Sequence, residues 1–399
     1  MNKEYSCLVA SSFIKKYKAG YPLITDEAIH ANLLKEEGVV FRLVDDSNDF
    51  IARAYYGKQN KGIGWVLTYD EQEVIDEAYF IRKFQAAFQQ RNSLFRDPET
   101  TSFRLFHAEG DGIGGLTIDY FAGFLLINWY SQGIYSFKKP ILKALEKTME
   151  YRGIYQKKRF DQGGKYVEED DYVVGERGSF PLIVKESGIQ FAVYLNEGAM
   201  VGVFLDQRDV RRTLRDHYAN GKTVLNTFSY TGAFSVAAAL GGATKTTSVD
   251  LANRSLRKTI EQFSVNGLDY EAHDIIVEDV FHYFKYAVKK QLTFDVVILD
   301  PPSFARSKKH TFKAGKDYPD LLKQAIAITA DNGLIIASTN CAQFQMKRFK
   351  VFIDQAFKEM GAAYQIVEEF SLPQDFKTTK SFKEGNYLKV VFIRKQTLK

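Results

Sequence analysis

Hydrophobic and polar positions follow different patterns in different parts of this 399-residue chain. Up to about residue 75, short β-type runs separated by turns predict a small barrel or sandwich, with runs at 7–10, 38–44, 50–56 and 64–68. From residue 189 onward, strand patterns alternate with helical patterns, with strands near Thr223, Thr246, Ile275, Phe294, Leu334 and Lys389. This alternation predicts a parallel, doubly wound α/β sheet whose last strands form an antiparallel hairpin.

The middle of the chain has the pattern of an α+β module. Phe80, Phe84 and Phe88 recur at helical spacing with polar residues between them, which predicts a helix with a buried aromatic stripe. Strands return over 104–130 around a Gly-rich turn, and a second helix is expected over 138–151. We therefore expect three domains, at residues 1–75, 76–188 and 189–399.

Composition narrows the class of protein. Two cysteines leave no room for a disulfide framework or a thiolate zinc cluster, and six histidines show no metal-ligand spacing, so we expect no metal and a reducing compartment. The chain begins without a charged leader, and its longest apolar run, around 121–130, is too short to span a bilayer. We expect a cytoplasmic protein without membrane attachment. A net charge of +5 mildly favours an anionic partner.

Two buried strands each end in a polar turn that carries candidate chemistry. The first turn, Asn226-Thr-Phe-Ser-Tyr-Thr-Gly232, has one glycine and several hydroxyls, whereas a dinucleotide pyrophosphate cradle needs several glycines. A single glycine suits a ligand without phosphates, such as S-adenosylmethionine. The second turn, Asp300-Pro-Pro-Ser303, is stiffened by its prolines and can hold a flat polar group such as a nucleobase edge.

Acidic residues follow three consecutive strands of the expected sheet. Asp250 is placed to accept both hydroxyls of a ribose, Asp279 to meet an adenine amino group, and Asp300 comes after the next strand. Taken singly, each is more often a helix cap or a turn former. Because the three occur in register beside the Pro-Pro turn, we expect a cofactor crevice along the carboxyl ends of these strands.

Basic residues follow the second turn without an intervening acid. They are Arg306, Lys308, Lys309, Lys313 and Lys316. Such a strip can bind phosphates through counterion release, whereas most charge runs are solvated surface loops. Its position beside the candidate turn favours nucleic acid as the partner.

Cys341, just past the strand near Leu334, is a candidate nucleophile. A thiolate there could add to carbon 6 of a pyrimidine, so that carbon 5 attacks a methyl donor while Asp300 assists as an acid. The alternative is a small buried apolar residue, which is what we expect for Cys7.

The segment before the sheet, Gly202–Arg208, ends with an acid, an amide and a guanidinium at an expected helix start. Asp206 or Arg208 could meet the carboxylate or the amine of a cofactor. The alternative is an N-cap with an exposed salt bridge, and spacing alone does not decide between the two.

The chain resembles the large-subunit ribosomal RNA cytosine-5 methyltransferase family, whose members join an N-terminal PUA domain, a middle domain and a Rossmann-like methyltransferase domain. The motifs that carry the resemblance span nearly all of the chain: Lys15–Ile24, Arg104–Asp119, Gly202–Arg208, Asn226–Phe234, Asp300–Ser303 and Glu384–Lys389. The resemblance implies S-adenosylmethionine bound by Asp206, Arg208, Asn226, Phe228, Ser229, Tyr230, Thr231, Asp250, Asp279 and Asp300. It also implies an RNA surface shared by the PUA domain and the basic strip, with ribosomal RNA as the partner. A homodimer is kept as a hypothesis.

One position departs from the family pattern. Members that form 5-methylcytosine carry Ser or Thr, then Cys, then Ser after the fifth strand, whereas this chain has Thr339-Asn340-Cys341. In an extended segment, a shift by one place points a side chain to the opposite face. The main hypothesis is formation of 5-methylcytosine in large-subunit ribosomal RNA, with Cys341 and Asp300 as catalytic residues. The alternatives are methylation of another base atom without a thiolate, a non-enzymatic RNA-binding protein, and a DNA methyltransferase.

Overall fold

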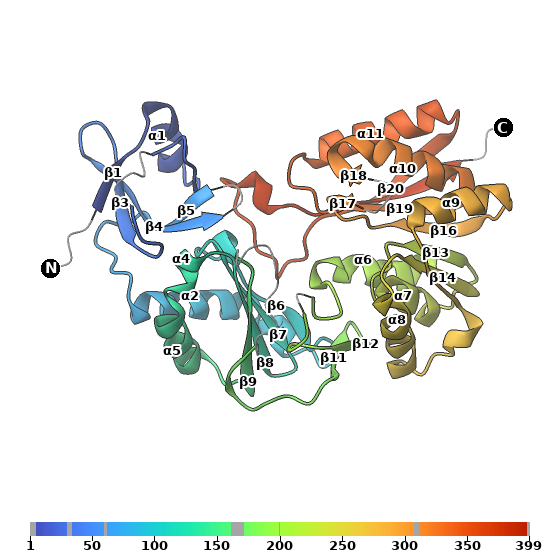
Figure 1. The fold of residues 1–399 in the computed structure, drawn as a ribbon, viewed down its shortest axis with the longest axis horizontal. Coiled ribbons are helices and arrows are strands. Elements are labelled where there is room, and N and C mark those ends of the chain that lie inside the picture. The colour runs from blue at the N-terminus through green and yellow to red at the C-terminus, as the bar shows by residue number, and fades with distance from the viewer. Residues whose placement is uncertain are drawn as a thin grey trace. The chain divides into compact units, whose positions relative to one another are not determined.

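The computed structural model describes residues 5–29, 34–59, 62–160, 171–198, 200–306 and 311–396, and for Arg306 the backbone alone. The chain forms two compact units, which are traced in Figure 1. Unit 1 contains Met1–Val184, Tyr194–Val201 and Gln374–Gly385, and unit 2 contains Lys185–Val193, Gly202–Pro373 and Asn386–Lys399. Over the described ranges, none of the helices combines the length and the apolar content that a bilayer crossing requires.

Two five-stranded sheets form the framework of unit 1. The first has the order β1-β3-β4-β5-β2, with β1 at Tyr5–Leu8, β2 at Leu23–Ile24, β3 at Val40–Val44, β4 at Phe50–Gln59 and β5 at Gly62–Thr68. The second has the order β10-β9-β8-β7-β6, with β6 at Ser102–His107, β7 at Leu116–Phe121, β8 at Phe124–Trp129, β9 at Gly153–Lys158 and β10 at Tyr172–Gly175. The strands predicted over residues 1–75 and 104–130 are therefore confirmed.

Helices of unit 1 pack between and beside these strands. They are α1 at Ser11–Lys18, α2 at Glu77–Gln90, α3 at Asn92–Phe95, α4 at Gln132–Tyr135 and α5 at Lys138–Thr148. The aromatic stripe predicted for α2 is confirmed, because Phe80, Phe84 and Phe88 are all buried. Asp76 begins α2 by accepting a hydrogen bond from the backbone N–H of Tyr79 over 3.0 Å.

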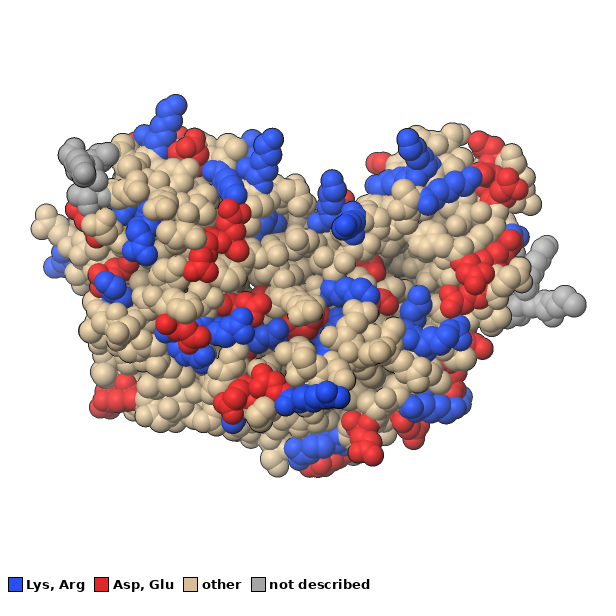
Figure 2. All heavy atoms as spheres, turned by 180° about the vertical axis from the view of Figure 1, so that it is seen from behind, with Lys and Arg blue, Asp and Glu red and all other residues tan. Residues whose placement is uncertain are grey.

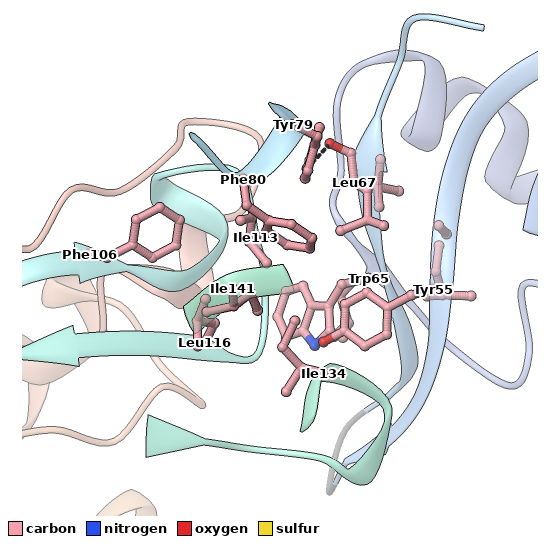
Figure 3. Close-up of a cluster of buried hydrophobic side chains, with 14 of the residues drawn as sticks. Tyr55, Trp65, Leu67, Tyr79, Phe80, Phe106, Ile113, Leu116, Ile134 and Ile141 are labelled. Carbon is pink, nitrogen blue, oxygen red and sulfur yellow. Dashed lines mark hydrogen bonds between the residues drawn. The ribbon is translucent and has the colours of Figure 1, made fainter. Parts of the chain in front are cut away.

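The two sheets of unit 1 share one hydrophobic core. Figure 3 shows side chains of β4 and β5 packed against side chains of α2, β6 and β7, among them Tyr55, Trp65, Phe80, Phe106 and Leu116. The Tyr55 hydroxyl donates to the carbonyl of Gly114 over 2.7 Å, and a Cβ added at Gly114 would lie 2.2 Å from the Trp65 ring. The predicted domain boundary near residue 75 stays a prediction, since the core continues across it.

A buried ion pair anchors the Gly-rich turn of unit 1. Arg91 donates to both carboxylate oxygens of Asp111 over 2.9 and 2.7 Å, and both side chains are 1% exposed. Arg91 also donates to the backbone carbonyl of Asp375, and the Phe382 ring packs edge-on against two aromatic rings of the same unit. The segment Gln374–Gly385 therefore belongs to unit 1, although the strands before and after it belong to unit 2.

Unit 2 is built on one seven-stranded sheet of order β15-β14-β13-β16-β19-β21-β20. Its strands are β13 at Thr223–Thr227, β14 at Lys245–Asp250, β15 at Asp274–Val277, β16 at Phe294–Leu299, β19 at Thr329–Thr339, β20 at Ala363–Phe370 and β21 at Lys389–Gln396. The first five strands in this order run parallel, and β21 is antiparallel to both of its neighbours. The predicted doubly wound sheet and its terminal hairpin are confirmed.

Helices cover both faces of this sheet (Figure 1). They are α6 at Arg208–Thr213, α7 at Ala233–Leu240, α8 at Arg254–Val265, α9 at Val280–Lys289, α10 at Ala314–Ile328 and α11 at Met346–Glu359. Helices α9, α10 and α11 contribute to one apolar cluster, and α6 and α7 contribute to another. The strand order reverses between β13 and β16, and a switch point of this kind opens a crevice at the carboxyl ends of the strands.

Candidate functional site

The candidate site lies at the switch point of the unit 2 sheet. Strand β13 continues into the turn 226–232, which leads into α7, and β16 continues into the turn 300–303 (Figure 1). The two strands are paired neighbours, with Thr227 opposite Leu299. The two turns that the sequence singles out therefore begin side by side at the same end of the sheet.

The first turn is conformationally strained. Phe228 and Tyr230 have φ values of 55° and 52°, in the left-handed region that residues other than glycine seldom adopt. Gly232 has a φ of 77°, and a Cβ there would lie 2.5 Å from Thr259 Cγ2, so the position requires glycine. Backbone strain persists only where the surroundings hold it, and it concentrates at ligand-binding sites.

Polar contacts hold this turn in place. The backbone N–H of Tyr230 donates to Asp250 Oδ2 over 2.9 Å, and that of Ser229 donates to the carbonyl of Val249 over 3.1 Å. The Thr231 hydroxyl donates to a backbone carbonyl, that of Gly202, over 2.6 Å. The turn is thus tied to β14 and to the segment before the sheet.

Two buried side-chain oxygens near the switch point accept no hydrogen bond from the described residues. Asn226 ends β13 with its amide nitrogen donating to Ser235 Oγ over 3.0 Å, while its Oδ1 has no hydrogen-bond partner among the described residues. Within the same ranges, Oε1 of Gln207 also has none. A buried acceptor left unpaired costs free energy, which a ligand that donates to it can recover. Both oxygens suit the N–H groups of an ammonium, so they fit the amino-acid end of the expected cofactor.

Backbone N–H groups donate hydrogen bonds to the carboxylates of Asp250 and Asp279. Asp250 accepts from two backbone N–H groups over 2.9 Å each. Asp279 caps α9, where its Oδ1 accepts from the N–H groups of Phe281 and His282 over 2.9 and 3.2 Å. Both residues thus form the turn or cap that is the usual role of an isolated Asp. Each carboxylate keeps lone pairs for a ligand, and their cofactor roles stay predictions.

Asp300 is held by side chains from two other segments. Gln207 Nε2 donates to its Oδ1 over 3.1 Å and to Ser338 Oγ over 2.8 Å. Burial raises the pKa of Asp300 to about 6, and the charge of Asp206 acts in the same direction. Hydrogen bonds from Ser338 and Gln207 and the charge of Arg211 act in the opposite direction. A carboxyl group with a raised pKa at a strand end is typical of functional sites.

Asp206 and Arg208 lie at the start of the helical segment before the sheet. The Tyr387 hydroxyl donates to Asp206 Oδ2 over 2.9 Å. Arg208 begins α6 with a side chain that is 7% exposed, and its Nε lies 3.9 Å from Asp209 Oδ1. The guanidinium in this ion pair is thus buried, whereas the alternative expected an exposed salt bridge. The cofactor roles of Asp206 and Arg208 stay predictions.

The loop after β19 presents Asn340, and not Cys341, beside the second turn. Asn340 is exposed, and its Oδ1 accepts from the Ser303 hydroxyl over 2.6 Å. Cys341 is 5% exposed and belongs to the apolar cluster formed with α9, α10 and α11. Its backbone carbonyl accepts from Lys389 Nζ over 2.8 Å. A shift by one place along the chain thus separates the two side chains, as the sequence pattern predicts.

The basic strip begins with a short hairpin, where a loop was expected. Strand β17 at Phe304–Arg306 pairs with β18 at Thr311–Lys313, and Phe312 alternates inward while Lys313 points to solvent. Lys316 is also exposed. Lys308 and Lys309 lie outside the described residues, as does the side chain of Arg306. On the face seen in Figure 2, Lys and Arg are interspersed with Asp and Glu, so positive charge is not gathered into one patch there.

Sequence reasoning missed three side chains of the site: Gln207, Ser338 and Lys389. Gln207 lies between Asp206 and Arg208, which were predicted as site residues because they are charged. Lys389 ends the Glu384–Lys389 motif, which was the available signal for it. Ser338 carried no sequence signal, because it is one small polar residue at the end of an apolar strand.

Comparison with known proteins gives matches over most of the chain. Residues 103–381 match the model of an S-adenosylmethionine-dependent methyltransferase family, and residues 8–69 match that of a PUA-like domain. YwbD of Bacillus subtilis (strain 168), a candidate ribosomal RNA large subunit methyltransferase, is 63% identical over 384 residues, covering 96% of this chain and 97% of the relative. Ribosomal RNA large subunit methyltransferase I of Aeromonas salmonicida (strain A449) is 31% identical, covering 90% and 91%. The crystal structure of a candidate methyltransferase complexed with SAH has a TM-score of 0.90 at 40% identity, covering 98% of this chain and 100% of that one.

Proposed function

Since the chain belongs to the S-adenosylmethionine-dependent methyltransferase family and carries a PUA-like domain, we propose that it methylates a base of large-subunit ribosomal RNA. It is an enzyme with S-adenosylmethionine as its cofactor, as the sequence predicted. The substrate is proposed because relatives that share most of its length are named for that RNA. The observation that carries the proposal is the pairing of β13 with β16, which brings the strained turn and the Asp300 turn together.

The residues around the switch point fit the cofactor in separate ways. When bound, S-adenosylmethionine supplies an electrophilic methyl group. We propose that Asn226 Oδ1 and Gln207 Oε1 accept hydrogen bonds from its ammonium, and that Asp250 accepts them from its ribose hydroxyls. The remaining contacts are assigned to Asp206, Arg208, Phe228, Ser229, Tyr230, Thr231, Asp279 and Asp300. The target base is assigned to the turn at Asp300, next to exposed Lys313 and Lys316.

The first candidate for the target atom is carbon 5 of a cytosine. Because this carbon is a poor nucleophile, the route requires the Cys341 thiolate to bond to carbon 6 of the ring and make carbon 5 electron-rich. Asp300, whose pKa is raised to about 6, would assist as the acid. After methyl transfer a base removes the proton from carbon 5, and the bond between sulfur and carbon 6 breaks.

A second candidate is a base atom that needs no thiolate. The burial of Cys341 in an apolar cluster favours it, because a covalent nucleophile must reach the ring of its substrate. Asn340 lies at the surface instead, bonded to Ser303 of the second turn. In this route Asp300, Pro301 and Asn340 orient the base, and the chain contributes no covalent step.

Substitution of Cys341 separates the two candidates. Cys341→Ala is compared with Cys7→Ala, which removes the other buried thiol from a strand of unit 1. Methyl transfer from labelled S-adenosylmethionine to ribosomal RNA is measured for both. Loss of transfer in Cys341→Ala alone supports the cytosine route, and retention in both supports the second candidate.

Mass spectrometry of ribosomal RNA nucleosides from cells with and without the protein tests the proposed function itself. One methylated nucleoside is expected to disappear when the protein is absent and to return when it is supplied. An unchanged nucleoside profile would contradict the proposal. We further propose a cytoplasmic location, where this RNA is found in the bacterial relatives, and sedimentation of the purified chain tests the hypothesis of a homodimer.

A further inference from the structure

Lys389 is a lysine buried at the first position of β21. It is 3% exposed and lies opposite Thr339, the last residue of β19. Its Nζ donates to the carbonyl of Cys341 over 2.8 Å and to the carbonyl of Tyr387, and it lies 5.3 Å from the centre of the Phe344 ring. Burial of an ammonium is costly unless its donors are used, so these contacts determine where the side chain can sit.

The loop that Lys389 contacts forms part of the candidate site. Ser338 Oγ accepts from Gln207, and the carbonyl of Ser338 accepts from the Tyr318 hydroxyl over 2.6 Å. Two residues later, Asn340 accepts from Ser303 of the second turn. The end of β19 and Asn340 of the loop are thus tied to the site by side chains. The carbonyl of Cys341, the residue after Asn340, accepts from Lys389.

We propose that Lys389 is a positioning residue for methyl transfer, whose ammonium group holds the carbonyl of Cys341 and so keeps Asn340 against Ser303. This inference rests on the proposed function, because it concerns the same site. Lys389 acts through the loop, because its Nζ donates hydrogen bonds to the backbone carbonyls of Cys341 and Tyr387. Burial lowers the pKa of Lys389 to about 8, while the charge of the neighbouring Cys341 acts in the opposite direction.

Lys395 supplies a matched control on the same strand. Its Nζ likewise donates to two backbone carbonyls, those of Ile326 and Thr329, over 3.2 and 2.7 Å, but at the other end of β21. We expect Lys389→Met to lower kcat by about 10- to 100-fold, as removal of a positioning group does, with the Kd of S-adenosylmethionine changed by less than about threefold. Lys389→Arg, which keeps the donors, is expected to recover part of kcat. Lys395→Met is expected to keep the kcat of the unmodified chain.

Hydrogen exchange tests the same inference without any turnover. In the chain without RNA, Lys389→Met is expected to speed amide exchange over residues 338–345, whereas Lys395→Met is expected to leave these amides unchanged. Unaltered exchange and unaltered kcat in Lys389→Met, or an equal loss of kcat in both variants, would overturn the inference. If the unmodified chain transfers no methyl group to ribosomal RNA, the proposed function fails, and the exchange rates then decide on Lys389 alone.

Discussion

A single nitrogen, Nε2 of Gln207, bonds to Asp300 Oδ1 over 3.1 Å and also to Oγ of Ser338. The bond to Asp300 joins residues that are 93 positions apart in the sequence, from the segment before the sheet to the end of β16. The orientation of the Asp300 carboxylate therefore depends on the segment before the sheet as well as on its own Pro-Pro turn.

Removal of the charge at Asp300 is expected to impair methyl transfer while keeping the fold. Asp300→Asn is expected to lower kcat by about 100- to 1000-fold, the effect of deleting one oriented electrostatic group in an active site. Asp295→Asn is the control, because Asp295 lies near the start of β16, the strand that ends just before Asp300, and accepts hydrogen bonds from Thr223. Initial rates with ribosomal RNA measure the effect, and equal rates in the two variants would contradict the assigned role of Asp300.

The raised pKa of Asp300 predicts how both stability and activity change with pH. Its pKa is about 6 in the folded chain and 3.8 ordinarily, so between these values the folded chain binds more protons, and this group's contribution to stability falls as pH rises. If Asp300 is the acid of the cytosine route, it must be protonated, and activity is expected to fall as pH rises above about 6. If its carboxylate only orients the base, activity is expected to fall as pH drops below about 6. A pH–rate profile checks this, since Asp300→Asn should lose the inflection. An inflection that persists in the variant belongs to another group.

Gly232 is expected to tolerate no side chain in the cofactor turn. Gly221 is the control, because its φ of 70° is similar to the 77° of Gly232, yet a Cβ at Gly221 meets nothing within 4 Å. Gly221→Ala should cost about 1 to 3 kcal/mol from backbone strain alone. Gly232→Ala should cost about 1 to 3 kcal/mol more, because its Cβ would clash with Thr259, and it should weaken S-adenosylmethionine binding. Denaturant unfolding and calorimetry measure both, and equal costs would show that Thr259 gives way.

The buried pair of Arg91 and Asp111 is expected to stabilise unit 1. Arg91→Met removes the guanidinium that pairs with both oxygens of the buried Asp111 carboxylate, which should lower the free energy of unfolding by about 3 to 5 kcal/mol. The exposed pair of Arg152 and Glu176 is the comparison, since its side chains are 49% and 52% exposed. Arg152→Met should unfold at nearly the same denaturant concentration as the unmodified chain. If the two variants are equally stable, the ion pair contributes nothing.

Lys313 and Lys316 are expected to contact phosphates of the RNA. The double variant Lys313→Ala with Lys316→Ala should weaken RNA binding, and the slope of log K against log salt should fall by about 0.7 to 0.9 for each phosphate that the protein no longer neutralises. Lys285→Ala with Lys289→Ala removes the same charge from exposed positions on α9. A binding titration at several salt concentrations compares the two. Equal slopes would place the RNA elsewhere.

The fold was largely predictable because its strongest signals are local. Buried β-branched runs that end in polar turns gave the strands of unit 2, and helical spacing of Phe80 and Phe84 gave α2. Helix α1 was missed, since Tyr17 is the buried residue among its eight positions and one residue shows no periodicity. The membership of Gln374–Gly385 in unit 1 was also missed, because it depends on contacts with residues far away in the sequence.

The candidate site was predictable where a residue follows a strand and less so where it acts through a distant partner. Asp250, Asp279 and Asp300 were predicted from their places at strand ends, and the structure has them at or just after the ends of β14, β15 and β16. Their cofactor roles stay predictions. Gln207 was not predicted, because it belongs to the candidate site through its hydrogen bond to Asp300, which no local sequence pattern encodes. The sequence shows that the cysteine stands at position 341 and not at position 340, where the family pattern has it. That Cys341 is buried and Asn340 exposed depends on how the loop packs, which the sequence does not show.

Each unit is assembled from three stretches of chain, and the two sets of stretches are interleaved. No single cleavage can therefore yield two complete halves. A break just before Gly202 would leave Arg91 without the carbonyl of Asp375, and Phe382 on a fragment without its aromatic neighbours. Grafting the N-terminal region onto a different methyltransferase would accordingly have to transplant residues 374–385 as well. Recombination between relatives is expected to preserve these distant pieces as a set.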